Sequence, residues 1–141
     1  SLFGSTDLAQ MVVLILGDAA GSHFDPGSYS AFKDWLNLAY ATNMAYMLSA
    51  QLAAMRLNVF NGLASGSALI YAPGASSANG AGFASVNAVV SEANAELGVH
   101  GTGWSGDPWR SYQEALKNAL DRANNNLTFV QASPCAFITP Y

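Results

Sequence analysis

An apolar segment at residues 43–60 constrains the fold more than any other part of the chain. Its larger hydrophobic residues recur at helical spacing, as Met44, Met47, Leu48, Leu52, Met55 and Val59. Alanines fill most of the other faces, and Gly62 supplies a C-terminal stop signal. A helix that is apolar on nearly every side is normally buried among several neighbours. We therefore predict an all-α single domain of about five helices with residues 43–60 at its centre.

Capping residues and periodicity predict the other four helices at about residues 7–16, 29–39, 83–97 and 108–123. Ser28 is a suitable N-cap for the second of the five helices. Gly98 is a stop signal for the fourth. The pair Asp107 and Pro108 is typical of a helix start, with Asp at the N-cap and Pro at the first helical position.

The C-terminal residues differ in character from the helical part. The stretch TFVQASPCAFITPY contains β-branched and aromatic residues, two prolines and no helical period. We therefore predict a helical domain over residues 1–127 and an extended tail over residues 128–141. In an alternative fold, the segment ALIYAP at residues 68–73 pairs with this tail as a small sheet beside the helices.

The chain carries few charges for its length. Charged residues make up 10% of it, against about 25% in ordinary soluble domains, and the net charge is -4. The five basic residues never form a run, so no basic stripe is available to hold a nucleic acid. The apolar run MVVLIL at residues 11–16 is far shorter than the roughly 20 residues of a membrane span. We expect neither nucleic-acid binding nor a membrane span.

Cys135 is the only cysteine of the sequence. A single cysteine excludes an internal disulfide and any zinc site built from several cysteines. The chain begins at Ser1 without a Met, which suits a processed exported protein or an excised fragment. In an exported protein, an odd cysteine suggests a disulfide with a neighbouring chain or with a missing N-terminal part. A free buried thiol is the alternative.

The stretch HGTGWSGDPW at residues 100–109 contains the G-x-G-x-x-G spacing of a dinucleotide-binding loop. Its glycines, Gly101, Gly103 and Gly106, follow a predicted helix rather than a strand, and no strand-helix-strand unit surrounds them. We interpret them as glycines of an interhelix turn and expect no cofactor. Trp104 and Trp109 flank the turn and are candidates for an exposed ligand-facing contact, or they seal the core.

Two groups of residues are weak candidates for a metal site. Glu92, Glu96 and His100 would lie along one side of the fourth helix if Gly98 did not break it. Solvated charges are the favoured interpretation of this group.

Asp18, His23 and Asp25 form the second group, in a loop that lacks the twelve-residue calcium pattern. Roles in turns and caps are favoured there, and we expect no bound metal.

Nucleophilic catalysis has little support in the sequence. No G-x-S-x-G motif occurs, and Cys135 is far in sequence from both His23 and His100. Gln51, in the middle of the apolar helix, is interpreted as a buried amide bonded to a loop backbone rather than a catalytic group. The sequence favours a protein that is not an enzyme.

The apolar helix also carries a motif of the type L-A-x-Q-L-x-A-x-x-L-N-V-x-N-G. The matching residues are Leu48, Gln51, Leu52, Ala54, Leu57, Asn58, Val59, Asn61 and Gly62. In this motif the chain resembles an uncharacterised helical module of large exported bacterial proteins. SALIYAPG, FASVNAVVSEANAELG and YQEALKNALDRANNN look like later parts of it, so the resemblance extends from about Phe24 to Pro134. The glycine-aromatic-tryptophan opening of that module is absent, and Ser1 begins just inside it.

The resemblance implies an extracellular or cell-surface setting and a non-enzymatic role, and it transfers no catalytic residue. The first functional hypothesis is a structural protein that self-associates into a fibre or layer, because a surface with few charges resists association weakly. Its contacts are predicted in the tail, at Phe129, Val130, Phe137, Ile138 and Tyr141. Folding of the tail back onto its own domain is the alternative.

A binding or adhesion module for a glycan or a protein partner, using Trp104 or Trp109, is the second hypothesis. A hydrolase is the third.

Overall fold

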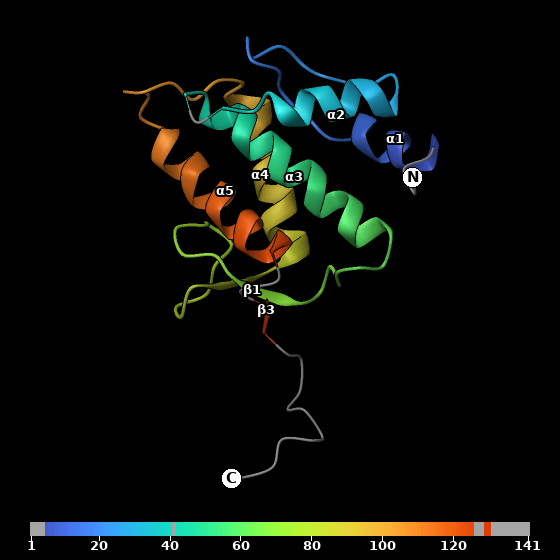
Figure 1. Ribbon diagram of the computed structural model, residues 1–141. Coiled ribbons are helices and arrows are strands. Elements are labelled where there is room, and N and C mark those ends of the chain that lie inside the picture. Colours follow the sequence, from blue (N-terminus) through green and yellow to red (C-terminus); the bar gives the residue numbers. More distant parts are fainter. Residues whose placement is uncertain (1–4, 41, 126–128, 131–141) are drawn as a thin grey trace.

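The computed structural model describes residues 5–40, 42–125 and 129–130, which form five helices and three short strands (Figure 1). The helices are α1 (Ser5–Val12), α2 (Tyr29–Asn37), α3 (Met44–Phe60), α4 (Val86–Val99) and α5 (Arg110–Asn124). The strands are β1 (Leu69–Tyr71), β2 (Phe83–Ser85) and β3 (Phe129–Val130). Figure 1 shows α1 and α2 on one side of α3 and the strands on the opposite side of the molecule.

Helix α3 forms the centre of the described fold. It packs against α1, α4 and α5. Leu48, Leu52, Ala53 and Met55 on this helix are completely buried. The small side chains on α3 allow neighbouring helices to approach closely, and the larger ones fill the space between them. The predicted central apolar helix is confirmed, and it begins at Met44.

The prediction of an all-α domain is incomplete, because a three-stranded antiparallel sheet accompanies the helices in the order β2-β1-β3. In the register between β1 and β2, Ile70 lies opposite Ala84, and both side chains are buried. Strand β1 lies within the segment ALIYAP and pairs with Phe129–Val130 of the predicted tail. The alternative fold with a small sheet is thus confirmed for the tail residues that the structure describes.

Strand β2 occupies Phe83–Ser85, where the sequence predicted the beginning of a helix. Pairing with β1 keeps this backbone extended, so a contact distant in the sequence overrides the local helical period. Helix α4 (Val86–Val99) follows the strand directly, because the Ser85 side chain accepts a hydrogen bond from the Ala88 N–H at 3.1 Å. This N-cap fixes the start of α4 at Val86.

Helix α1 ends at Val12, whereas the sequence predicted a helix to residue 16. The backbone beyond it bonds to other elements instead of continuing the helix. The Ile15 N–H donates to Asn94 Oδ1 at 2.6 Å, and the Gly17 N–H donates to Ser49 Oγ at 3.0 Å. The β-branched residues of this run favour such an extended path.

Two predicted helix boundaries are wrong: the end of α4 at Gly98 and the start of α5 at Asp107 and Pro108. Helix α4 continues through Gly98 to Val99, and a Cβ on Gly98 would lie 3.0 Å from Ile15 Cδ1. The glycine therefore allows close packing rather than ending the helix. Helix α5 begins at Arg110, because the Asp107 carboxylate accepts a hydrogen bond from the Trp104 N–H and closes a turn ahead of the helix.

Candidate functional site

An open groove with a volume of about 510 Å³ lies beside α2. We call it the Trp35 groove, and its larger lining residues are Asp18, Phe24, Trp35, Leu38, Tyr40 and Tyr46. The loop after α1, helix α2 and helix α3 each contribute an aromatic ring. The Phe24 ring stacks on Trp35 with centroids 4.9 Å apart, and the Tyr46 ring lies 5.6 Å from Trp35. The arrangement is a concave surface made largely of aromatic carbon.

Polar atoms of the buried aromatic residues are bonded inside the fold. Trp35 Nε1 donates to the Gly17 carbonyl at 3.0 Å, and the Tyr46 hydroxyl donates to the Trp35 carbonyl. Burial raises the pKa of Tyr46, and the nearby Asp18 carboxylate and the Tyr40 phenol raise it further. These bonds fix the rings. Among the described residues that line the groove, Asp18 is the one with a charged side chain.

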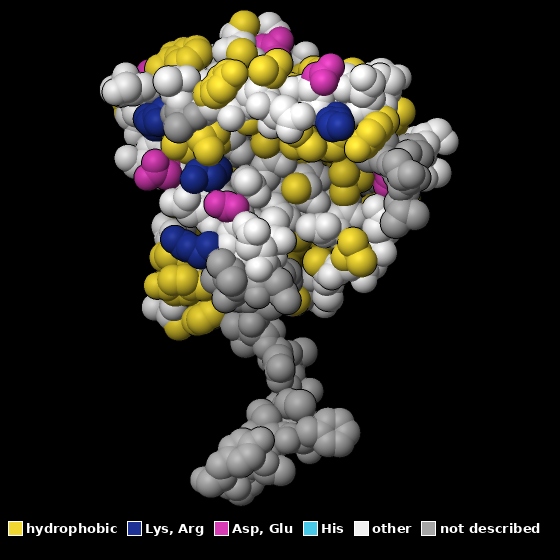
Figure 2. Space-filling view, in the orientation of Figure 1, with side chains coloured by type: hydrophobic (Ala, Val, Ile, Leu, Met, Phe, Trp, Pro, Cys, Tyr) yellow, Lys and Arg dark blue, Asp and Glu magenta, His cyan; other side chains and the backbone are white. Residues whose placement is uncertain are grey.

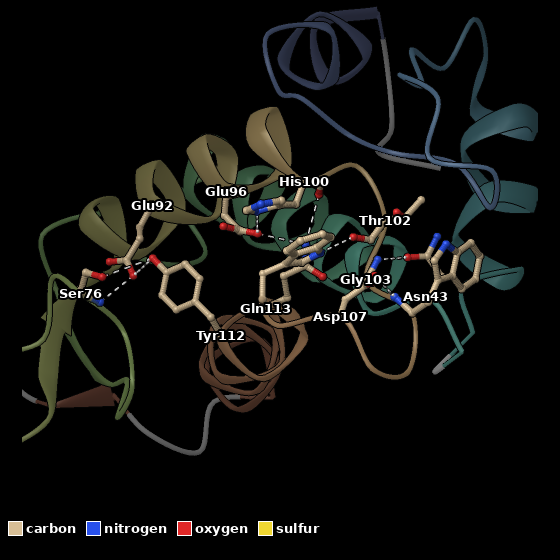
Figure 3. A network of polar contacts seen from close by, with 12 residues as sticks. Asn43, Ser76, Glu92, Glu96, His100, Thr102, Gly103, Asp107, Tyr112 and Gln113 are labelled. Atoms are coloured by element: carbon tan, nitrogen blue, oxygen red, sulfur yellow. Dashed lines mark hydrogen bonds and ion pairs between the residues drawn. The ribbon is translucent and has the colours of Figure 1, made fainter.

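A second group of polar residues runs between α4 and α5 (Figure 3). At one end the Glu92 carboxylate accepts hydrogen bonds from the Ser76 N–H at 2.7 Å, the Ser77 N–H at 2.9 Å and the Tyr112 hydroxyl. Burial alone would raise the pKa of Glu92, but these hydrogen bonds together lower it. Burial and the same carboxylate raise the pKa of Tyr112 to about 12. These hydrogen bonds hold the loop between β1 and β2 against α4 and α5.

At the other end the Glu96 carboxylate is shared between two partners. His100 Nδ1 lies 2.8 Å from Glu96 Oε2, and Gln113 Nε2 donates to the same oxygen at 3.1 Å. The His100 ring stacks on Trp109 with centroids 4.0 Å apart. Trp109 Nε1 donates to the Thr102 carbonyl at 2.7 Å. These contacts fix the path of the loop between α4 and α5.

Gly101, Gly103 and Gly106 lie in that interhelix loop, as the sequence predicted. The Gly103 N–H donates to Asn43 Oδ1 at 3.0 Å, and its carbonyl accepts from the Met44 N–H at 2.9 Å. A Cβ on Gly101 would lie only 2.7 Å from the Gly21 carbonyl oxygen. Gly101 therefore allows the loop to pack against other backbone, and the polar groups of Gly103 are used within the fold. Gly106 has a φ of 94°, a conformation that favours glycine.

Glu92 and Glu96, from the first group of weak metal candidates, form hydrogen bonds with different residues. Glu92 binds Tyr112 and the loop before β2, whereas Glu96 binds His100 and Gln113. Within residues 5–40, 42–125 and 129–130, no group of three His, Cys, Asp or Glu side chains is arranged to hold a metal ion.

In the loop after α1, Asp18 has the role in a turn that the sequence favoured. Asp18 Oδ1 accepts hydrogen bonds from the Ala20 and Ser22 N–H groups, each at 2.9 Å. His23 Nε2 lies 3.0 Å from Asp25 Oδ1, and both side chains are exposed. Asp18 therefore shapes the turn and also faces the Trp35 groove.

The two candidate tryptophans differ in their surroundings. Trp104 is 43% exposed, which suits a surface contact. Trp109 is half-buried, with its ring against His100 and its N–H bonded to Thr102. Of the two, Trp104 is the more accessible side chain.

Gln51 bonds differently from the prediction. Its Oε1 accepts a hydrogen bond from Asn124 Nδ2 at 2.8 Å, so its partner is a side chain of α5 rather than a loop backbone. The same amide of Asn124 also donates to the Gln51 carbonyl. The pair ties the C-terminal end of α5 to the middle of α3, which suits a structural role.

Of the residues predicted to form tail contacts, Cys135, Phe137, Ile138 and Tyr141 lie outside the part of the chain that the structure describes. The backbone of Phe129–Val130 forms β3 and pairs with β1 of the same chain.

The described part of the chain is a helical domain with a small antiparallel sheet at one side. No protein-family model matches the sequence, and no curated protein or solved structure gives a significant match. None of the helices in the described residues has both the length and the apolar character needed to cross a bilayer.

The Trp35 groove was not among the sites predicted from the sequence. Trp35 was placed on a helix, but its neighbours Phe24 and Tyr46 come from a loop and from another helix. A local signal existed in Phe24, inside the loop at residues 17–27, and in the aromatic residues that follow this loop. Their convergence depends on tertiary packing, which periodicity does not reveal.

Proposed function

We propose that this chain is a non-catalytic module of an extracellular or cell-surface protein and that it associates with copies of itself in a fibre or layer. The observation that carries the proposal is a surface with many apolar groups and few free charges. Figure 2 shows hydrophobic side chains spread over one face, with several of the charged side chains gathered toward the left of the view. Leu63 is 79% exposed, Val99 73% and Val13 61%. Contacts between such surfaces carry a small desolvation cost.

The charges that are present are largely used within the domain. Hydrogen bonds or ion pairs inside the chain engage the carboxylates of Asp7, Asp18, Asp25, Glu92, Glu96, Asp107 and Asp121. Carboxylates engaged in this way are less available to interact with solvent or other molecules. Hydrogen bonds from neutral groups do not cancel these charges, so repulsion between copies is set by the net charge of -4.

The extracellular setting is supported by the resemblance of residues 43–62 to the module of exported bacterial proteins. The motif residues lie mainly on α3, the helix around which the domain packs. They therefore relate to the fold and give no direct evidence for catalysis. Self-association in such a setting would make the domain a building unit of a larger structure.

Added charge on the exposed apolar surface tests this proposal. Val13 follows α1 and Val99 ends α4, and the two regions meet where Ile15 lies against Gly98. Val13→Glu and Val99→Glu should reduce assembly measured by static light scattering, because an unpaired charge must then be desolvated at a contact. Ser22→Glu places the same charge at an exposed polar position as the control. Equal assembly in all variants would argue against an apolar contact here.

The tail contribution needs a separate test. Deletion of residues 131–141 leaves β3 in place and removes Phe137, Ile138 and Tyr141. If the tail makes the contact between copies, the shortened chain remains folded and monomeric while the full chain assembles. Equal assembly by both would place the contact elsewhere on the domain.

A second candidate function is recognition of a ligand through aromatic side chains. The Trp35 groove favours it, because concave aromatic surfaces are typical of binding sites. Screening against polysaccharides and small ligands tests this candidate. Binding that is saturable and lost in Tyr40→Ala assigns it to the groove, whereas loss in Trp104→Ala assigns it to the loop between α4 and α5.

A further inference from the structure

The Trp35 groove has an unusual balance of aromatic and polar groups. Its rings come from Phe24, Trp35, Tyr40 and Tyr46. Tyr40 is 57% exposed at its edge and Phe24 is half-buried, whereas Trp35 and Tyr46 are only 4% and 3% exposed and lie at its floor. The volume of about 510 Å³ is within the range of small-molecule sites. Aromatic faces attract cations through the ring quadrupole, and Trp and Tyr do so more strongly than aliphatic side chains.

Hydrogen-bonding groups are scarce on this surface. Trp35 Nε1 and the Tyr46 hydroxyl both donate to backbone carbonyls within the fold. A sugar ring would require several converging donors and acceptors, whereas these two are already engaged. An anion would meet the Asp18 carboxylate without a basic lining residue to offset it.

Asp18 provides charge complementarity for the opposite kind of ligand. Its Oδ1 is held by two backbone N–H groups of its own turn, so the carboxylate has a fixed position. In the described part of the chain, no Lys or Arg lines the groove. The raised pKa of the Tyr46 phenol, caused by burial and then by Asp18 and Tyr40, agrees with a negative local potential.

We propose that the Trp35 groove binds an organic cation with apolar substituents, of the quaternary ammonium class. The inference rests on the second proposed function, recognition of a ligand through aromatic side chains. The alkyl groups lie against the accessible rings of Tyr40 and Phe24, and the positive charge faces Asp18. Loss of either the rings or the carboxylate therefore weakens binding.

Calorimetric titration of the full chain with choline, in parallel with its neutral isostere 3,3-dimethylbutan-1-ol, tests the proposal. Choline should bind saturably and at least about tenfold more tightly than the isostere, since the two differ mainly in charge. Asp18→Asn preserves an oxygen for the turn and removes the charge. It should abolish most of this preference, while Glu114→Gln, the same change on the exposed face of α5, should leave it intact.

The aromatic contribution is measured with Tyr40→Leu, which keeps an apolar side chain at an exposed position. Choline affinity should fall by about threefold to tenfold, and the control Tyr71→Leu, the same change at an exposed position of β1, should bind as the parent does. Circular dichroism of each variant establishes that it is folded before its affinity is compared.

Three outcomes overturn the inference. Equal affinity for choline and its isostere contradicts cation recognition but leaves the groove as a binding site. Preferential binding of a methyl glycoside replaces the ligand class and keeps the second proposed function. If choline, the isostere and the glycoside all fail to bind, both the inference and that function are wrong.

Discussion

The side-chain amide of Gln113 restricts which residue can occupy position 103 in the loop between α4 and α5. This side chain is completely buried, and its Nε2 donates to Glu96 Oε2 and to the His100 carbonyl. Its Oε1 has no hydrogen-bond partner and points toward Gly103, where a Cβ would lie 1.9 Å from it. A Cα hydrogen of Gly103 occupies that space, and such a C–H group is a weak donor. The close approach of the Gln113 side chain therefore accounts for a glycine at position 103.

Gly103→Ala should consequently destabilise the domain by about 1–3 kcal/mol, because the added methyl overlaps Gln113 Oε1 and lies 3.2 Å from the Ala45 nitrogen. Urea unfolding at constant pH measures the free energy of unfolding. Gly80→Ala is the control, since a Cβ there meets no atom within 4 Å. Equal stability of the two variants would show that the loop adjusts at no cost.

The hydrogen bond between Tyr112 and Glu92 predicts how stability depends on pH. The pKa of Glu92 is lowered, so its contribution is present above the ordinary value of 4.5 and is lost as the pH falls through the lowered pKa. The pKa of Tyr112 is raised from 10.0 to about 12, so its contribution is present below pH 10 and is lost as the pH rises toward 12.

Tyr112→Phe removes the donor and should lower the free energy of unfolding by about 1 kcal/mol near pH 7, since the pair is only partly buried. The difference from the parent should shrink at both pH extremes in chemical denaturation. Tyr71→Phe, at an exposed position of β1, is the control. A difference that is independent of pH would contradict the assignment of this bond.

At the scale of elements, the sequence predicted those whose signals are local. Helix α3 was predicted closely because nearly every face is apolar, and the Ser28 cap of α2 was predicted from residue type. Strand β2 was missed because its pairing partner lies elsewhere in the sequence. Gly98 was misread because its role is contact with Ile15, which the sequence does not show.

The candidate site was harder to predict from the sequence than the helices, because it is formed by tertiary packing. Asp18 was recognised as a turn residue, and Trp104 and Trp109 as aromatic residues near a loop. The Trp35 groove combines residues from separate elements, and no spacing in the sequence predicts that they meet.

Leu52→Asp tests the role of α3 as the central helix. Leu52 is completely buried, so a carboxylate there would lose its hydration without a partner. We expect a loss of more than about 4 kcal/mol, comparable to the whole stability of a small domain, and hence an unfolded circular dichroism spectrum. Phe60→Asp, at the exposed end of the same helix, should remain folded. Parent-like helicity and melting temperature in Leu52→Asp would make the central-helix assignment wrong.

The whole molecule combines a well-packed helical interior with a surface that has few free charges. Several polar side chains form hydrogen bonds with one another inside the domain, such as Glu92 with Tyr112 and Glu96 with Gln113. Exposed apolar residues remain on α1, α4 and the loop after α3. Such a distribution favours contacts between copies, and a contact that does not close a ring propagates into a fibre or layer.

Sedimentation velocity of the full chain, across about a hundredfold range of protein concentration, tests self-association most directly. We predict that high-mass species grow with concentration. They should persist when salt is raised, because the proposed contact is apolar and salt screens only charges. The Val99→Glu variant should assemble less at every concentration. A full chain that sediments as a monomer throughout the range would contradict the account.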